Sequence, residues 1–229
     1  MSHNSEESGP FPYHEQPGGL RLSPELGLDD ERERELRDFA WEQILTGIDD
    51  SEEFCELAED EFELEEKVLA QAFDQLLSVR REQQHRWPPE VRETALTRAF
   101  ADLAGIGIVA RENFTCCGTC ASSEIYGEVD DSRIWRGYVY YHSQDAARIV
   151  EDRRTYIGYG AFLEPVMSED EWNALSDTAK EETYQRLVID LMRDEVIPLL
   201  ERHGIDVEWD GSFARRILLK GVDWYADVR

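Results

Sequence analysis

The pattern of apolar positions divides the chain into a helical first part and a mixed second part. Between residues 29 and 87, apolar side chains recur every three or four residues, as at Leu36, Ala40 and Ile44. That spacing places them on one face of an amphipathic helix. Asp50, followed by Ser51 and two glutamates, predicts a helix start with acids in its first turn. The sequence therefore predicts several helices here, each with one buried face.

Beyond residue 87 the pattern alternates between short strands and helices. Pro88 and Pro89 predict the opening of another helix, which glycines at 105 and 107 end before a first strand. Residues 137–141 and 156–162 are rich in aromatic and β-branched side chains, as strands are. A longer helix is predicted from about residue 177. Alternating residues 205–209 and a second apolar run after an Asp-Gly pair predict a C-terminal β-hairpin.

These elements predict an α+β fold, in which N-terminal helices pack with a sheet of about five strands, with interleaved helices and a C-terminal β-hairpin. Residues 1–28 are rich in Ser, Gly and Pro and are expected to be a flexible tail. Residues 29–87 form an acidic helical segment and residues 88–229 an α+β domain. We expect residues 29–229 to make one compact unit, with three layers if helices cover both faces of the sheet.

Charge changes the picture of the helical part. The chain holds 51 acidic and 24 basic residues, a formal net charge of −27. Residues 24–66 alone contain 19 acids and 3 arginines, a local charge of −16. Such a surface repels nucleic acids and anionic membranes, so binding to either is not expected. The acidic helices are either a solvated face or a docking surface for a basic protein partner.

No signal for export or membrane insertion is visible. The first 28 residues lack a basic segment followed by an apolar run, and no stretch of 18 apolar residues occurs. A cytoplasmic location is therefore expected. In that compartment Cys55, Cys116, Cys117 and Cys120 are expected to be free thiols or metal ligands, not a disulfide framework.

The run Cys116-Cys117-Gly118-Thr119-Cys120 is the strongest chemical motif, and it follows a predicted strand. Cys117 and Cys120 have the C-x-x-C spacing of thiol oxidoreductases. The same pair is half of a zinc site, which Cys116, His142 or Cys55 could complete. As a third interpretation, all these cysteines are inert side chains packed under the sheet. No cofactor is expected on the packing interpretation, and zinc is the alternative.

His142 and Asp145 lie at the predicted end of a strand, where sites in α/β-type sheets gather. They could form an acid–base pair, with the carboxylate orienting the imidazole. In the alternative, Ser143 and Asp145 only cap the next helix. No nucleophile elbow, Walker loop or dinucleotide-binding glycine pattern is present. The sequence therefore assigns no catalytic residue and leaves open whether the protein is an enzyme.

Four motifs resemble a bacterial domain family of unknown function. They are GIVARENFTCCGTC, RGYVYYHSQD, YIGYGAF and EWDGS, which occur in this order. The resemblance covers about residues 90–225 and leaves out the acidic helices. It implies a bacterial, cytosolic domain and carries no activity to any residue.

Two functional hypotheses remain from the sequence. The favoured one is a non-catalytic interaction or regulatory protein with an acidic surface. The alternative is a zinc-binding or thiol-redox protein that uses Cys116, Cys117 and Cys120. The sequence predicts neither a substrate nor an oligomeric state.

Overall fold

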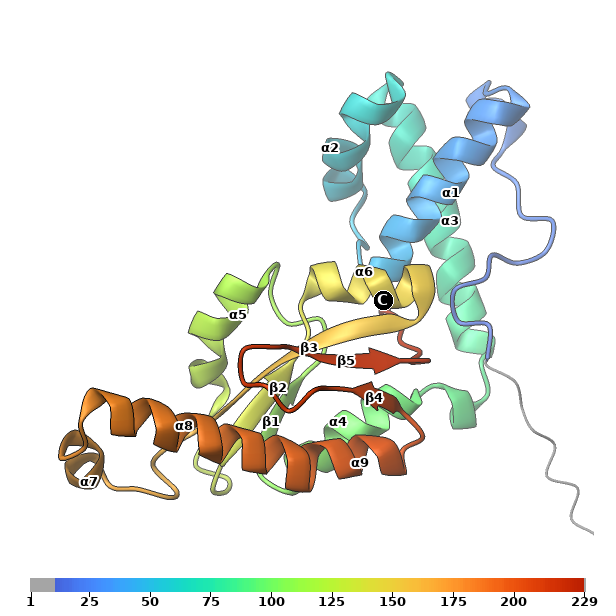
Figure 1. Ribbon diagram of the computed structural model, residues 1–229. Helices are drawn as coiled ribbons and strands as arrows, with labels where there is room; N and C mark the ends of the chain where they lie inside the picture. Colours follow the sequence, from blue (N-terminus) through green and yellow to red (C-terminus); the bar gives the residue numbers. More distant parts are fainter. Residues whose placement is uncertain (1–10, 229) are drawn as a thin grey trace, which may run out of the picture. The chain divides into compact units, whose positions relative to one another are not determined.

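The computed structural model describes residues 11–228, which form two compact units (Figure 1). One unit contains residues 11–92 and 225–228, and the other contains residues 93–224. No helix within residues 11–228 combines the length and the apolar character needed to span a membrane.

The helical unit is built from three helices, α1 (Asp30–Thr46), α2 (Ser51–Phe62) and α3 (Glu66–Arg86), with short turns η1 (Pro24–Leu26) and η2 (Pro89–Val91). The carboxylates of Asp29 and Asp50 accept backbone N–H groups in the first turns of α1 and α2, which starts both helices. The predicted apolar stripes are buried. Leu36 and Ile44 of α1 and Phe73 of α3 are inaccessible to solvent.

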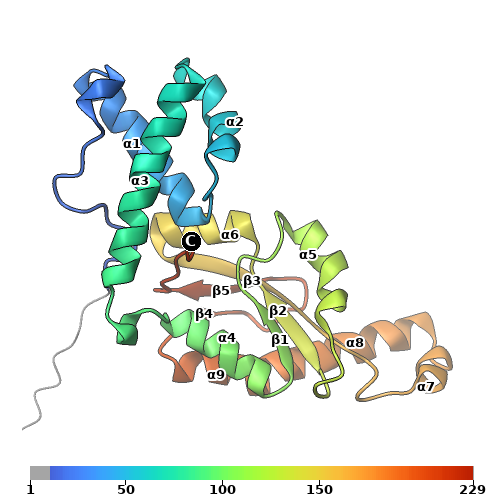
Figure 2. The ribbon, with the colours of Figure 1, turned by 180° about the vertical axis from the view of Figure 1, so that it is seen from behind.

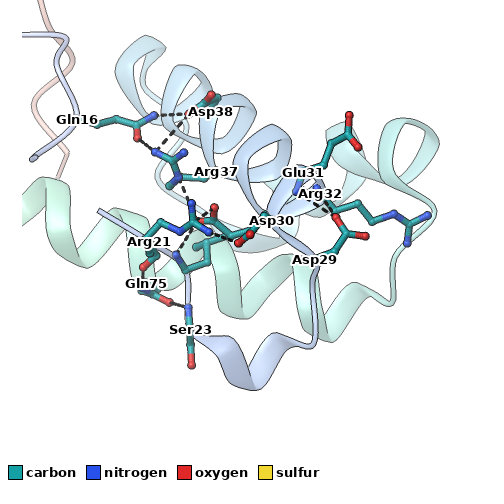
Figure 3. Close-up of polar contacts among 12 residues, drawn as sticks. Gln16, Arg21, Ser23, Asp29, Asp30, Glu31, Arg32, Arg37, Asp38 and Gln75 are labelled. Carbon is teal, nitrogen blue, oxygen red and sulfur yellow. Dashed lines mark hydrogen bonds and ion pairs between the residues drawn. The ribbon is translucent and has the colours of Figure 1, made fainter. Parts of the chain in front are cut away.

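Residues 11–28 lie against α1 and α3 in this unit. The flexible tail predicted for residues 1–28 falls outside the described residues in its first ten positions. Gln75 of α3 accepts the backbone N–H of Ser23 at 2.9 Å and donates to the Arg21 carbonyl at 2.9 Å (Figure 3). Gln16 donates to Asp38 of α1 at 2.9 Å. Hydrogen bonds that involve side chains therefore hold residues 11–28 against α1 and α3, although this segment has almost no regular secondary structure.

A fully buried arginine lies in the same unit. The Arg80 guanidinium lies 4.8 Å from the centre of the Trp87 ring and 5.9 Å from that of Tyr225, and it donates to the Tyr13 carbonyl at 2.7 Å. Burial lowers the pKa of Arg80 to about 10, so it stays charged at neutral pH. Aromatic faces thus take the place of a carboxylate in compensating a buried cation.

The second unit contains a five-stranded mixed sheet, with the order β1-β2-β3-β5-β4. Its strands are β1 (Ile108–Arg111), β2 (Gly137–Tyr140), β3 (Arg154–Ala161), β4 (Asp206–Glu208) and β5 (Ile217–Lys220). Strands β1 and β2 are parallel, and every other neighbouring pair is antiparallel. The α+β class, the five-stranded sheet and the C-terminal hairpin β4–β5 are therefore confirmed.

Helices cover both faces of this sheet. Figures 1 and 2 show α5 (Gly118–Glu124) and α6 (Ser143–Asp152) on one side and α4 (Ala95–Gly105), α8 (Asp177–Leu191) and α9 (Ile197–Arg202) on the other. The remaining short elements are η3 (Ile125–Glu128), α7 (Glu169–Asn173) and the π-helical turn η4 (Met192–Val196). Strand β2 is buried along its whole length, as a central covered strand must be.

Two local predictions differ from the structure. The helix expected at Pro88 and Pro89 begins only at Ala95, because Thr94 supplies the cap by accepting the Thr97 N–H at 3.1 Å. The proline pair forms only the turn η2. The hairpin β4–β5 is joined by residues 209–216, a longer loop than a tight Asp-Gly turn gives.

Glycines in β3 let two tyrosine rings of β2 lie flat across the sheet. Gly158 is paired with Tyr140, and Gly160 with Tyr138. A Cβ at Gly158 would lie 2.6 Å from Cζ of Tyr140, closer than real Cβ contacts. The two rings are parallel within 16° and pack with Val109, Ile125 and Phe162. The absence of a side chain at Gly158 and Gly160 therefore makes room for the tyrosine rings.

Candidate functional site

The cysteine cluster follows a tightly held loop at the end of β1. The loop is tied to the chain after β2 by main-chain bonds: Phe114 N–H donates to the Tyr141 carbonyl at 2.8 Å, and Ser143 N–H donates to the Thr115 carbonyl at 3.1 Å. Asn113 and Thr115 have φ angles of 47° and 60°, in the left-handed region that residues other than glycine rarely adopt. The surrounding main-chain hydrogen bonds therefore stabilise a strained backbone conformation in this loop, which places Cys116 and Cys117 at the start of α5.

The three cysteine sulfurs lie together at that point. Sγ of Cys120 is 3.6 Å from Sγ of Cys116 and 3.7 Å from Sγ of Cys117, and all three lie within 4.8 Å of one another. Cys116 is exposed, and the other two are half-buried. The three thiols therefore lie at the surface. The interpretation in which they are packed under the sheet is wrong for these residues.

The local environment shifts the pKa values of two of the thiols in opposite directions. The pKa of Cys117 is lowered from the ordinary thiol value, mainly by the backbone N–H of Cys120, with further help from the Cys120 thiol and the backbone N–H of Thr119. The pKa of Cys120 is raised to about 11, because its side-chain hydrogen bonds with Cys116 and Cys117, and the negative charge that those thiols can carry, favour its protonated form. Cys117 is therefore the first of the pair to become a thiolate, which is the form that binds metals and attacks electrophiles.

His142 and Asp145 form a pair next to the cluster. His142 Nε2 is 3.0 Å from Asp145 Oδ2, and both side chains are more than nine-tenths buried. The pKa of His142 is lowered, chiefly by burial, while the Asp145 carboxylate opposes the shift. The imidazole is thus neutral at neutral pH, with its Nε2 proton directed to Asp145.

Arg216 completes this pair from the β4–β5 loop. Its guanidinium donates to both oxygens of Asp145, with Nη1 at 3.1 Å from Oδ1. Ser143 Oγ donates instead to the Thr115 carbonyl at 2.9 Å. The alternative in which Ser143 and Asp145 only cap α6 is therefore wrong. Both side chains form their hydrogen bonds with residues outside this helix.

The structure brings some of the predicted residues together and not others. Cys116, Cys117 and Cys120 share one cluster, whereas His142 is bonded to Asp145 and is not part of it. Cys55 lies on α2 in the helical unit, where it is buried and its thiol is 3.7 Å from the Glu66 carbonyl. Within residues 11–228, the side chains grouped closely enough to hold a metal ion at this position are therefore the three cysteines.

Sequence reasoning missed the partnership of Arg216 with Asp145 and the burial of Glu112. Glu112, which follows β1, accepts hydroxyl groups of Thr97 and Tyr141 at 3.2 Å each. Burial raises its pKa to about 7, and the two hydroxyl bonds only partly oppose this. Arg216 is 71 positions from Asp145, so no local pattern could have joined them.

No curated protein and no solved structure matches the chain. Residues 29–226 match the family described as a domain of unknown function (DUF6891), so the match includes the acidic helices as well as the motifs around the cysteines. Because the match covers most of the chain, the protein belongs to this family.

Proposed function

We propose that the protein binds a thiophilic metal ion, in the first place zinc, through Cys116, Cys117 and Cys120. The observation that carries this proposal is the spacing of the three sulfurs. Zinc bound to thiolates at about 2.3 Å in a tetrahedron places neighbouring sulfurs about 3.8 Å apart. The two sulfur–sulfur distances that Cys120 makes, 3.6 and 3.7 Å, are close to that edge, and the third is no longer than 4.8 Å.

The charge state of the cluster supports the same proposal. Metal ions bind thiolates, and the lowered pKa of Cys117 makes its thiolate more readily available than that of an ordinary cysteine. Binding would then displace the protons of the other two thiols. Three protein ligands leave one tetrahedral position for water or an external ligand, an arrangement typical of sites that react or transfer metal and not of closed structural sites.

Native mass spectrometry of the intact protein, purified without chelator and then given one equivalent of zinc, tests the proposal. We expect one zinc per chain in the wild type. Cys117→Ser and Cys120→Ser should lose it, whereas the matched control Cys55→Ala should keep it, because Cys55 is in the other unit. Zinc retained by Cys117→Ser would contradict the proposal. A zinc-free protein with one rapidly alkylated thiol would favour thiol-redox chemistry by the same residues.

A second candidate function is the docking of a basic partner on the helical unit, and a groove there favours it. The groove has a volume of about 560 Å³ and is lined by the half-buried apolar side chains of Phe39, Phe62 and Leu64. Exposed acids outnumber exposed arginines around it, with Glu35, Asp38, Glu61 and Glu63 against Arg32 and Arg34. An amphipathic basic helix has the complementary pattern of apolar anchors and positive charge.

A synthetic lysine–leucine amphipathic peptide, titrated against the intact protein at two salt concentrations, tests this second function. Phe39→Ala should weaken binding by removing an apolar contact, and Glu61→Lys should weaken it more at low salt than at high salt. Glu169→Lys, an exposed acid of α7 in the other unit, is the control. Equal binding by all variants would mean that the groove is not the docking surface.

A further inference from the structure

The α+β unit contains a cleft separate from the cysteine cluster. It lies between the first turn of α5, the end of β2, the strand β3 and the β4–β5 loop, and its volume is about 290 Å³. Arg215 and Arg216 line it, and no acidic side chain does. In a chain with more than twice as many acids as bases, this local charge balance is unusual.

The two arginines are held in different ways. Arg216 is fixed by the Asp145 carboxylate and also donates to the Tyr156 carbonyl. Arg215 has a side chain that is 76% exposed, and its only close carboxylate among the described residues is that of Asp210, at 3.4 Å. One guanidinium therefore provides a rigid wall, and the other can turn toward a bound anion. Guanidinium groups bind carboxylates in two-pronged geometry.

The cleft also has an apolar wall. Tyr159 and Phe213 line it, and Phe213 is one of the few large apolar side chains that remain exposed. The Tyr159 hydroxyl donates to the Arg215 carbonyl at 2.6 Å, which fastens the loop to the sheet. Ligand sites commonly combine such aromatic surface with a few polar groups that fix orientation.

One buried polar atom of the residues that line the cleft has no hydrogen-bond partner among the described residues. The His142 ring lines the cleft, and its side chain is only 9% exposed. Its Nδ1 is buried and has no hydrogen-bond partner among the described residues, a costly state for a polar atom. The hydroxyls of Ser122 and Tyr140 lie at the same wall. Ser122 Oγ donates to the Gly118 carbonyl at 2.7 Å and accepts the Tyr140 hydroxyl at 2.9 Å.

We infer that this cleft binds a small organic carboxylate, with the carboxylate held by Arg215 and Arg216 and the organic part covered by Phe213 and Tyr159. The inference does not rest on the metal site. Gly118 and Ser122, four residues apart on α5, face the cleft, and Cys120 between them points to a different side of the helix. Ligand and metal would therefore occupy different faces of the same turn.

Titration of the full-length ¹⁵N-labelled protein with benzoate tests the inference. We expect saturable shifts of the backbone amides of Gly118, Gly158 and Arg216, and no saturation with the neutral analogue benzyl alcohol. Arg215→Gln should weaken benzoate binding by about tenfold, because one charged hydrogen-bonding group is lost. Arg193→Gln, an exposed arginine paired with Asp190 on another part of the same unit, is the matched control and should bind as the wild type does.

Three results would overturn the inference. The first is the absence of a saturable benzoate shift in the millimolar range. The second is equal affinity in Arg215→Gln and the wild type. The third is inorganic phosphate that saturates the same amides at lower concentration than benzoate, which would make the ligand an inorganic oxyanion. Cys120→Ser should bind benzoate normally, so a failure of the metal proposal and a failure of this inference are distinguishable.

Discussion

The two units of the protein solve the burial of charge in opposite ways. In the helical unit, Arg80 is buried among aromatic rings, the Tyr13 carbonyl and the Gln83 amide oxygen, with no carboxylate partner among the described residues. In the α+β unit, Asp145 is buried against the cation of Arg216 and the imidazole of His142. The first arrangement joins chain segments that have little regular structure, whereas the second joins a helix to a distant loop beside a cleft.

The most strongly charged part of the chain and the reactive side chains also lie in different units. The acidic stretch of residues 24–66 gives the helical unit its strong negative charge, yet the exposed thiols and the cleft with two arginines lie in the α+β unit. Net charge therefore indicates which partners the surface attracts and does not locate the reactive groups.

The largest effect is expected for Arg80→Ala, which would remove the centre of the aromatic cluster in the helical unit. The loss should be about 3–5 kcal/mol in the free energy of unfolding, because a large buried side chain and its bond to Tyr13 both disappear. Hydrogen exchange should rise first in residues 11–28. Arg80→Met keeps most of the volume and should cost less, so equal losses in the two variants would mean that the charge matters and the packing does not.

The next largest effect is a pH dependence of the stability of the α+β unit, which we expect from Glu112. Its pKa rises from 4.5 to about 7 on folding, because burial disfavours the ionised form. The folded state therefore binds the proton more tightly, and stability should fall as pH rises from about 4.5 to about 7, by on the order of 1–3 kcal/mol. Denaturant unfolding at pH 5 and pH 8 measures this fall. Glu112→Gln should make it smaller, and an unchanged fall would contradict the assignment to Glu112.

Gly158→Ala should destabilise the α+β unit by about 1–3 kcal/mol, because the new methyl group would collide with the ring of Tyr140. Gly127 is a matched control in the same unit, since nothing lies within 4 Å of a Cβ built there. Thermal unfolding of the two alanine variants gives the comparison. If Gly158→Ala is as stable as Gly127→Ala, the flat tyrosine packing is not tight.

The smallest effect is expected from the cap of α2. Asp50→Ala removes the acceptor of two backbone N–H groups, at 3.0 Å each from Glu52 and Glu53, and should cost about 1 kcal/mol. Asp50→Asn keeps an acceptor oxygen and should cost only a few tenths. Urea unfolding curves distinguish them, and identical curves for the two variants would show that the carboxylate does not act as a cap.

Local patterns predicted much of this fold, for reasons visible in single elements. The stripe of Leu36, Ala40 and Ile44 marks a buried helical face whatever surrounds it. The alternation through Val207 needs only its own strand and the next one. Ser168 and Glu171 have the spacing typical of a capping box and form one, because all its bonds lie within four residues.

The contacts that sequence patterns could not predict join distant residues. Gln75 holds Arg21 and Ser23 from more than 50 positions away, so nothing near residues 11–28 indicates their ordered path. Arg216 reaches Asp145 in the same way. At the candidate site, the sequence indicated that the three cysteines are close, since they are neighbours in the chain. It could not show that they lie at the surface, or that His142 pairs with Asp145.

X-ray absorption at the zinc K edge of the protein loaded with one equivalent of zinc tests the central claim most directly. The account predicts three sulfur neighbours at about 2.3 Å and one lighter neighbour at about 2.0 Å. A spectrum with only nitrogen and oxygen neighbours would contradict the claim that Cys116, Cys117 and Cys120 form the metal site.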